Sequence, residues 1–432
     1  MTAFAVPTSW IFWAQEQAVE LDRGLAVRWG LWLVVGFLAV FPGIVAYMVL
    51  LERKAAARFQ DRIGPNRVGP LGLLQPIADA LKLLTKEDLV PRGADALVHL
   101  AAPVLVIVSA FLMLAVIPFA VGMAPVDLPS GVLYLIAASS LSPLGVFLAG
   151  WSSRNKYSLL GAMRAVAQLV SYEIPQVLSV IPIVLWGGGL SLVAIFDEQA
   201  AFGWFIASPP GLLAFLILLV ASIAELNRAP FDIPEAESEI VAGFHTEYSG
   251  MRFSLFFLAE YLSVFAVGCL ATALFLGGGM PIPFARFPLN LLDGSLARLV
   301  VVDLILLAVF AAKVFSFVLL MIWIRATLLR LRVDRLMNFA WKYLTPLAIA
   351  NILVSGIWYE CVIRPGALTL GRWLGGTLVT GPMVAGLVWL VFWVNRRDWA
   401  GEAAGPGRPS LEGARPDRET SGRTGASPQR AH

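Results

Sequence analysis

Nine long apolar runs constrain this chain more than any other feature of its sequence. A helix that crosses a hydrocarbon core of about 30 Å needs about 20 apolar residues. With 58% of 432 residues apolar and 14% charged, the composition lies outside that of soluble domains. We predict an all-α polytopic membrane protein with about nine transmembrane helices, eight in a core and one C-terminal. The expected spans lie near residues 30–51, 100–122, 130–151, 166–188, 210–228, 253–277, 299–324, 343–359 and 376–395.

The distribution of lysine and arginine predicts the orientation. With the N-terminus outside, the inner segments carry 25 of the 32 basic residues, which agrees with the positive-inside rule and places the C-terminus in the cytoplasm. We divide the chain into an outside segment 1–29, a membrane domain 30–398 and a disordered cytoplasmic tail 399–432, rich in Gly, Pro, Arg and Ser. The membrane domain includes a first cytoplasmic loop, 52–99, and an acidic cytoplasmic loop, 225–252.

Few residues in this chain are suited to hold a redox cofactor or a metal. Its two cysteines, Cys269 and Cys361, lie in or beside expected spans and form no CxxC motif. Three scattered histidines are too few for a metal or haem site, and no phosphate loop or dinucleotide fingerprint is present. We therefore expect no metal and no redox cofactor in this chain, and the net charge of +3 gives no reason to expect nucleic-acid binding.

The first cytoplasmic loop contains a compact Gly/Pro turn, IGPNRVGPLG, followed by an amphipathic segment. Pro76 is placed to open a helix in which Ile77, Leu81 and Leu84 share one face with Leu74. Such a helix is suited to lie in the membrane interface, where it would form the mouth of a cavity for a lipid-soluble molecule. The alternative is an ordinary basic loop that only sets the orientation.

Acidic residues are concentrated between 225 and 247. Asp232 and Glu235 suit the cap of a short helix, and this accounts for them without any chemistry. Capping does not explain the other acids of this stretch, which are Glu225, Glu237, Glu239 and Glu247.

Four of the charged residues within expected spans stand out, because ionisable groups at membrane depth are costly and are functional candidates. Counting 1.5 Å per residue from the cytoplasmic ends places Glu225 at a depth of roughly 5 Å, Glu260 at about 12 Å, Glu173 at about 14 Å and Lys313 at about 18 Å. This stepped set predicts a proton or ion route. The alternative is that each residue is a structural hydrogen-bonding group.

Three segments resemble those of a known family. They read ERKAAARFQDRIGPNRVGPLGLLQPIADALKLLTKED, RAVAQLVSYEIPQ and AELNRAPFDIPEAESEIVAGFHTEYSGMRFSLFFLAEY. Together they are similar to the membrane-embedded H subunit of respiratory complex I, the proton-translocating NADH–quinone oxidoreductase of the inner (plasma) membrane of bacteria. The resemblance covers about residues 30–360.

The resemblance implies a chamber for a quinone substrate, ubiquinone or menaquinone, coupled to proton translocation. It implies that FMN and iron–sulfur clusters belong to partner subunits of the complex, and that this chain contacts those subunits and membrane lipid. The residues that it assigns to quinone binding are Arg53, Arg62, Asp79 and Phe244. Those that it assigns to the proton pathway are Glu173, Glu225, Glu260 and Lys313, with Glu235, Glu237, Glu239 and Glu247 in the acidic loop.

Two alternative functions remain open at this point. One is the membrane anchor of a related membrane-bound hydrogenase, and the other is a stand-alone proton-coupled transporter. The intact GPNRVGP and QPIAD segments favour a quinone chamber over the first alternative. The lack of an evident internal repeat argues against the second.

Overall fold

The computed structural model describes residues 40–119, 126–232, 242–280, 303–364 and 370–403. Every regular element within these ranges is helical. Seven helical segments there are long and apolar enough to cross a membrane, so the prediction of an all-α multi-pass membrane protein is confirmed. These segments are Ala96–Leu114, Gly131–Ser152, Lys156–Trp186, Gly250–Phe275, Leu304–Thr327, Val333–Ile363 and Gly371–Asn395.

The number of nine spans stays a prediction. The expected fifth span is α10, Pro209–Glu225, an apolar helix of only 17 residues. The expected first span is described only from residue 40, where most of it belongs to α3, Phe41–Phe59. The segment 1–29 lies outside the described residues, as does the expected tail beyond the end of α17 at Ala403.

Two helices extend further beyond their apolar runs than the sequence pattern indicated. α3 continues through Arg53 to Phe59, where a loop was expected from residue 52. α8, Lys156–Trp186, begins before the expected boundary at 166, and its first turn is capped by Asn155, whose Oδ1 accepts from the Tyr157 amide at 3.0 Å. An apolar run identifies only the part of a helix that lies in hydrocarbon. The helix itself can continue through charged residues beyond that run.

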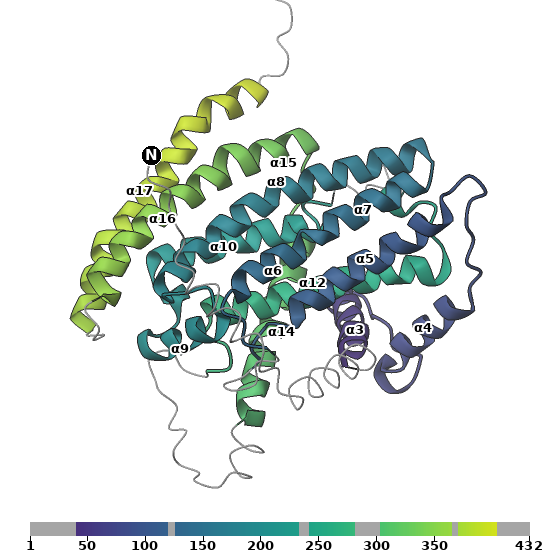
Figure 1. Ribbon diagram of the computed structural model, residues 1–432, viewed down its shortest axis with the longest axis horizontal. Coiled ribbons are helices and arrows are strands. Elements are labelled where there is room, and N and C mark those ends of the chain that lie inside the picture. The colour runs from purple at the N-terminus through teal and green to yellow at the C-terminus, as the bar shows by residue number, and fades with distance from the viewer. Residues whose placement is uncertain (1–39, 120–125, 233–241, 281–302, 365–369, 404–432) are drawn as a thin grey trace, which may run out of the picture.

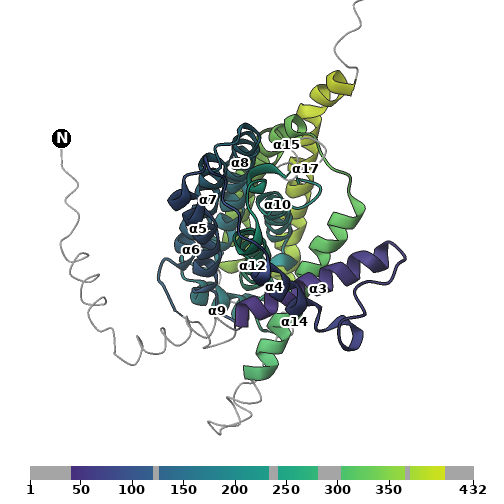
Figure 2. The same cartoon turned by 90° about the vertical axis from the view of Figure 1, so that its right-hand side faces the viewer.

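Figure 1 shows the central helices running alongside one another, with α16 and α17 at one edge of the molecule and α3 and α4 at the other. Figure 2 shows from the side that α3 and α14 extend away from the bundle formed by α5, α7 and α8. The remaining bounds are α4 Gln75–Thr85, α5 Ala96–Leu114, α6 Gly131–Ser139, α7 Leu141–Ser152, α9 Leu192–Phe202, α12 Gly250–Phe275, α14 Asp303–Thr327, α15 Val333–Phe339, α16 Thr345–Trp358 and α17 Leu370–Ala403.

Small residues allow the central helices to approach closely. A Cβ at Gly145 of α7 would lie 2.4 Å from a methyl carbon of Val106 on α5. At such contacts the helices pack backbone against side chain, as is common where lipid supplies no hydrophobic drive for association. Large side chains fill the space between the other helices, and Trp186 of α8 also donates from Nε1 to the Ser355 carbonyl of α16 at 3.0 Å.

Candidate functional site

A cavity of about 420 Å³ opens between α3, α4 and α12, and we call it the mouth cavity. Its lining is mostly apolar, with polar groups gathered on the side formed by α4 and the end of α3. Cavities of this size and character are typical of sites for small apolar molecules. The lining residues are Pro42, Val45, Ala46, Val49, Leu50, Arg53, Gln75, Pro76, Asp79, Ala80, Lys82, Leu83, Met251, Phe253, Ser254, Phe257, Leu258 and Tyr261.

Asp79 is the polar centre of the mouth cavity. Its Oδ2 accepts from Arg53 NH1 at 2.7 Å, and its Oδ1 accepts from Gln75 Nε2 at 3.2 Å. The Lys82 ammonium lies 3.6 Å from Oδ1. The structure therefore brings two predicted residues, Arg53 and Asp79, into direct contact, and it adds Gln75 and Lys82 to them.

The two faces of α4 differ as the sequence pattern predicts. Ile77, Leu81 and Leu84 are 54%, 58% and 62% exposed, while the opposite face lines the mouth cavity. Pro76 stands in the first turn, where its missing amide hydrogen costs nothing. The amphipathic helix is thus confirmed, and its contact with a membrane surface stays a prediction.

Arg62, the third predicted quinone residue, lies in a different place. It lines a cleft of about 330 Å³ together with Lys54, Arg58 and Asn66, in the turn between α3 and α4. Its Nε donates to Gln60 Oε1 at 2.7 Å. Arg62 is absent from the lining of the mouth cavity, so its role in quinone binding stays a prediction.

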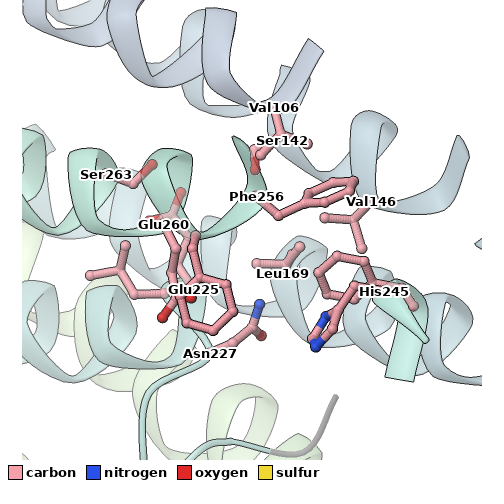
Figure 3. Close-up of a pocket in the computed structure, with 13 residues that line it drawn as sticks. Val106, Ser142, Val146, Leu169, Glu225, Asn227, His245, Phe256, Glu260 and Ser263 are labelled. Atoms are coloured by element: carbon pink, nitrogen blue, oxygen red, sulfur yellow. The ribbon is translucent and has the colours of Figure 1, made fainter. Parts of the chain in front are cut away.

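A second, smaller cavity of about 60 Å³ contains two of the predicted in-span acids, and we call it the inner cavity. Figure 3 shows Glu225 and Glu260 at one side of it with Asn227 next to them, and His245 further along, near Leu169. Glu225 is the last residue of α10, and Glu260 comes from α12. Phe257 lines both the inner cavity and the mouth cavity, so the two cavities meet at its side chain.

Glu260 belongs to a buried ion network. Its Oε1 lies 2.8 Å from Arg228 Nε, and Arg228 NH1 reaches both oxygens of Glu52 at 2.9 and 3.1 Å. Arg325 of α14 pairs with the same Glu52, and the Arg228 guanidinium lies 4.3 Å from the centre of the Tyr261 ring. The network thus joins α3, α12, α14 and the turn after α10 with two cations and two anions.

Sequence patterns alone missed Glu52, Arg228 and Arg325 as site residues. Each was counted only as a charge at the cytoplasmic end of an apolar run. The one available signal was their position: each stands where a span ends, at a depth where its partners must come from neighbouring spans.

Glu173 lies in a third cavity, of about 20 Å³, which we call the side cavity. Gln176 and Ser139 line it together with apolar residues. Glu173 therefore lies in a different cavity from Glu225 and Glu260, and Glu260 pairs with Arg228.

The turn that carries Glu225 is held by Gln168 of α8, a residue that is 2% exposed. Its Nε2 donates to the carbonyls of Ala224 and Phe231, each at 2.7 Å. Asn227 within the turn has a φ of +50°, a backbone conformation that costs less for asparagine than for most residues. Gln168 thus fixes the direction in which the end of α10 presents its carboxylate.

The loop before α12 packs tightly on α8. A Cβ at Gly161 would lie 2.7 Å from the Cα of Gly243, and Ser158 Oγ donates to the Phe244 carbonyl at 2.9 Å. Phe244 is buried and lines the inner cavity, not the mouth cavity. Its neighbour His245 lines the same cavity, and burial lowers the pKa of His245 to about 4.

The acidic loop is described only in part. Glu247 accepts a hydrogen bond from Asn155 Nδ2 at 2.6 Å, which ties the loop to the start of α8. Glu235, Glu237 and Glu239 lie outside the described residues.

Comparison with known proteins decides the family. The NADH dehydrogenase family model matches residues 32–356. The chain belongs to this family. It is 49% identical over 333 residues to the H subunit of the NADH-quinone oxidoreductase of Dehalococcoides mccartyi strain CBDB1, covering 76% of this chain and 87% of that protein. It is 48% identical over 346 residues to the H subunit of the NADH-quinone oxidoreductase of Geobacillus kaustophilus, which covers 79% of this chain and 98% of that protein. It is 47% identical over 337 residues to the same subunit of Brevibacillus brevis, which covers 77% of this chain and 95% of that protein.

The NADH dehydrogenase match includes all three cavities but ends before α17. It also includes Lys313, which the structure places away from the three in-span glutamates. The Lys313 ammonium donates to the carbonyls of Leu276, Gly278 and Met280 at 2.6, 2.8 and 2.6 Å, just beyond the C-terminal end of α12. Leu276 is roughly 24 Å along the axis from Glu260. The place of Lys313 in a proton pathway stays a prediction.

Proposed function

We propose that this chain is the membrane-embedded H subunit of an NADH–quinone oxidoreductase, that it forms much of the quinone chamber, and that it couples quinone reduction to proton translocation. One observation carries the proposal: the mouth cavity and the acid-lined inner cavity meet at a single side chain, Phe257. A ligand in the first cavity therefore lies next to carboxyl groups that can take up and pass on protons. The names of the relatives support the same assignment.

The mouth cavity suits a quinone in two ways. Its apolar walls from α3 and α12 match an isoprenoid tail, and its polar side offers N–H donors to a quinone carbonyl oxygen. Arg53 is the donor that we assign to this contact, and Asp79 is the residue that positions the Arg53 guanidinium. Arg62 and Phe244 complete the proposed set of quinone-binding residues. Arg62 lines the cleft before α4, and Phe244 lines the inner cavity.

The substrate is ubiquinone or menaquinone, and no cofactor is covalently bound to this chain. Electrons reach the quinone from FMN and iron–sulfur clusters, which we assign to partner subunits. The partners are the peripheral quinone-module subunits, the small membrane subunits and membrane lipid. The complex lies in the inner (plasma) membrane of a bacterial cell, with the N-terminus of this chain outside and its C-terminus in the cytoplasm.

Protons would move through Glu225 and Glu260, which line the inner cavity, and Glu173, which lines the side cavity. Reduction of a quinone to a quinol consumes two protons, so a change of charge beside the inner cavity can shift the protonation of these acids. Lys313 would act at the outer end of the route. The acidic loop, with Glu235, Glu237, Glu239 and Glu247, would form its cytoplasmic entrance.

The hydrogenase anchor and the stand-alone transporter are not favoured. The relatives named above are all quinone oxidoreductase subunits, and the identity extends over most of this chain. Purification separates the two functions: a stand-alone transporter would be active without flavin- and cluster-bearing partners, whereas a subunit of the complex would purify together with them.

The assembled complex allows a direct test of both halves of the proposal. Arg53→Ala and Arg62→Ala should lower NADH–quinone reduction more than NADH–ferricyanide reduction, because ferricyanide takes electrons from the upstream cofactors. Glu225→Gln and Glu173→Gln should lower quinone reduction and the proton yield per quinone. Equal losses with the two acceptors would contradict the quinone assignment, and full coupled activity in both glutamine variants would contradict the relay.

A further inference from the structure

The segment that follows α4 is tied to the start of α12 by polar contacts between Glu87–Leu89 and Ser249–Arg252, which we call the clasp. Ser249, the residue before α12, accepts at Oγ from the Leu89 amide at 2.8 Å and donates to the Glu87 carbonyl at 3.2 Å. Gly250 has a φ of +55°, and a Cβ there would lie 3.1 Å from the same carbonyl oxygen. The two backbones therefore lie directly against each other.

Arg252 completes the clasp with an ion pair. Its Nε lies 2.9 Å from Asp88 Oδ2, and the two side chains are 19% and 39% exposed. Its NH1 lies 3.1 Å from Nδ1 of His99 in α5, and because an arginine can only donate, that nitrogen is the acceptor. His99 is fully buried and stacks on Tyr248, with ring centres 3.9 Å apart. The guanidinium thus has one partner fixed in the interior and one in the segment after α4.

The clasp lies at one end of the mouth cavity. Lys82 and Leu83, near the end of α4, line that cavity, and so do Met251 and Phe253, the two sequence neighbours of Arg252. Arg252 itself is absent from the lining. It can therefore act on a ligand in this cavity only through the position of the walls.

Few contacts hold α4 in its place. It lies at the edge of the molecule (Figure 1), and none of its 11 residues, all of which the structure describes, is buried. A helix without buried side chains gains little free energy from packing, so polar contacts contribute a large share of what holds it. Asp79 pairs with Arg53 of α3, and the clasp fastens the segment after α4 to α12. The two anchors thus join α4 to the two other walls of the mouth cavity.

We propose that Arg252 is a positioning residue for the quinone: by holding Asp88, it fixes how far α4 lies from α12 and so sets the width of the mouth cavity. The proposal rests on the proposed function and adds to it a residue outside the linings of the mouth and inner cavities. Loss of the clasp leaves the reacting groups in place but lets α4 move. Quinone binding therefore weakens, while the turnover of bound quinone is retained.

Arg252→Gln in the assembled complex is the first test, because glutamine keeps a donor but loses the charge that pairs with Asp88. We expect the apparent KM for decylubiquinone to rise roughly three- to tenfold, from the loss of one half-buried ion pair, with kcat changed by less than about twofold. Menadione is the probe for a complex that reduces menaquinone. Asp88→Asn should raise the KM equally, and the double variant should raise it no further. NADH–ferricyanide reduction should be unchanged in all three variants.

Arg364→Gln is the control for a lost arginine–carboxylate pair. Arg364 pairs with Glu360 at 2.6 Å in the segment after α16, and neither residue lines the mouth, inner or side cavity. This variant should keep the wild-type KM and kcat.

A disulfide across the clasp provides a rescue that a general loss of stability would not show. The contact between the Leu89 amide and Ser249 Oγ brings the two Cα atoms within the roughly 7 Å that a disulfide can span. Leu89→Cys combined with Ser249→Cys should therefore cross-link on oxidation. In the Arg252→Gln background, oxidation should return the KM to the wild-type value, and reduction should raise it again. The reduced pair and each single cysteine variant are the matched controls.

The outcomes separate this proposal from the proposed function. If Arg53→Ala leaves the quinone kinetics unchanged, the quinone assignment of the mouth cavity is wrong. If Arg53→Ala is impaired while Arg252→Gln keeps the wild-type KM, or while the oxidised cysteine pair fails to restore it, only the role of Arg252 is wrong. If Arg252→Gln does not assemble, Asp88→Asn decides, because it removes the same ion pair from its more exposed side and leaves Arg252 with His99. A wild-type KM in Asp88→Asn would overturn the proposal.

Discussion

The mouth cavity and the buried ion network beside the inner cavity each contain an arginine–carboxylate pair, and the two pairs differ in burial more than in geometry. Arg53–Asp79 and Arg228–Glu52 are 2.7 and 2.9 Å long. The side chains of the first pair are 50% and 24% exposed, whereas those of the second are 11% and 12% exposed. Exposed pairs are worth about 0–1 kcal/mol, and breaking a buried pair costs about 3–5 kcal/mol.

This difference separates two roles for the same chemistry. At the mouth cavity, little free energy holds Arg53 on Asp79, so a ligand oxygen can take the place of the carboxylate. In the buried network of Arg228, Glu52 and Glu260, the ions hold helices together, and their loss would leave buried charges without partners. Substitutions in the two regions should therefore differ in kind, and the largest effects belong to the inner one.

Arg228→Gln should have the largest effect. It leaves Glu52 with Arg325 alone and Glu260 without its cation, so we expect a loss of about 3–5 kcal/mol and little assembled complex. The amount of complex in membranes and its rate of thermal inactivation measure this. Arg332→Gln is the control, because Arg332 pairs with Asp334 at an exposed site and should have no measurable effect. Normal assembly of Arg228→Gln would remove the distinction between the two regions.

Gln168→Leu should come next. It leaves the carbonyls of Ala224 and Phe231 without their side-chain donor and frees the turn that carries Glu225. We expect a destabilisation of about 2 kcal/mol, from the cost of unsatisfied buried polar groups. Thermal inactivation of the complex measures it, with Thr85→Val as an exposed control on α4. An equal, small effect of both variants would show that the inner region is not held more rigidly than the mouth.

Asp79→Asn should change binding more than stability. Arg53 and Lys82 lose their anion, but both are largely exposed, so the free energy of unfolding should change by about 1 kcal/mol or less. We expect a several-fold change in the apparent KM for quinone with an unchanged rate of ferricyanide reduction. Quinone titrations of the assembled complex measure this. A loss of assembly like that of Arg228→Gln would show that the mouth pair is structural.

His245 should have the smallest effect near neutral pH. Its pKa is about 4 in the folded chain and about 6.5 when exposed, so the folded state favours the neutral ring. Below pH 6.5 the unfolded chain binds a proton that the folded chain does not, and stability therefore falls as the pH drops from about 6.5 towards 4. His245→Phe should flatten this part of the pH dependence of thermal inactivation. An unchanged profile in His245→Phe would assign the effect to other groups.

Local patterns in the sequence predicted the helices and the amphipathic α4 well, because both follow from the apolar periodicity of single segments. The same patterns misplaced the C-terminal end of α3 and the N-terminal end of α8, since a helix can continue past the hydrocarbon boundary. They also placed Lys313 in one stepped set with the three glutamates, on the basis of its depth in the membrane alone. The structure shows its ammonium on the carbonyls beyond α12.

The sequence by itself determined the membrane class, the family, the acids within spans and the polar residues of the first loop. Only the tertiary structure decided which of those groups meet: Arg228 and Glu52 are 176 residues apart, and Gln168 reaches a carbonyl 63 residues away. The physical reason is that an apolar pattern records which face of a helix is buried, but not against which neighbour. A proton route depends on that second choice, because it is formed by side chains of different helices that touch only after packing.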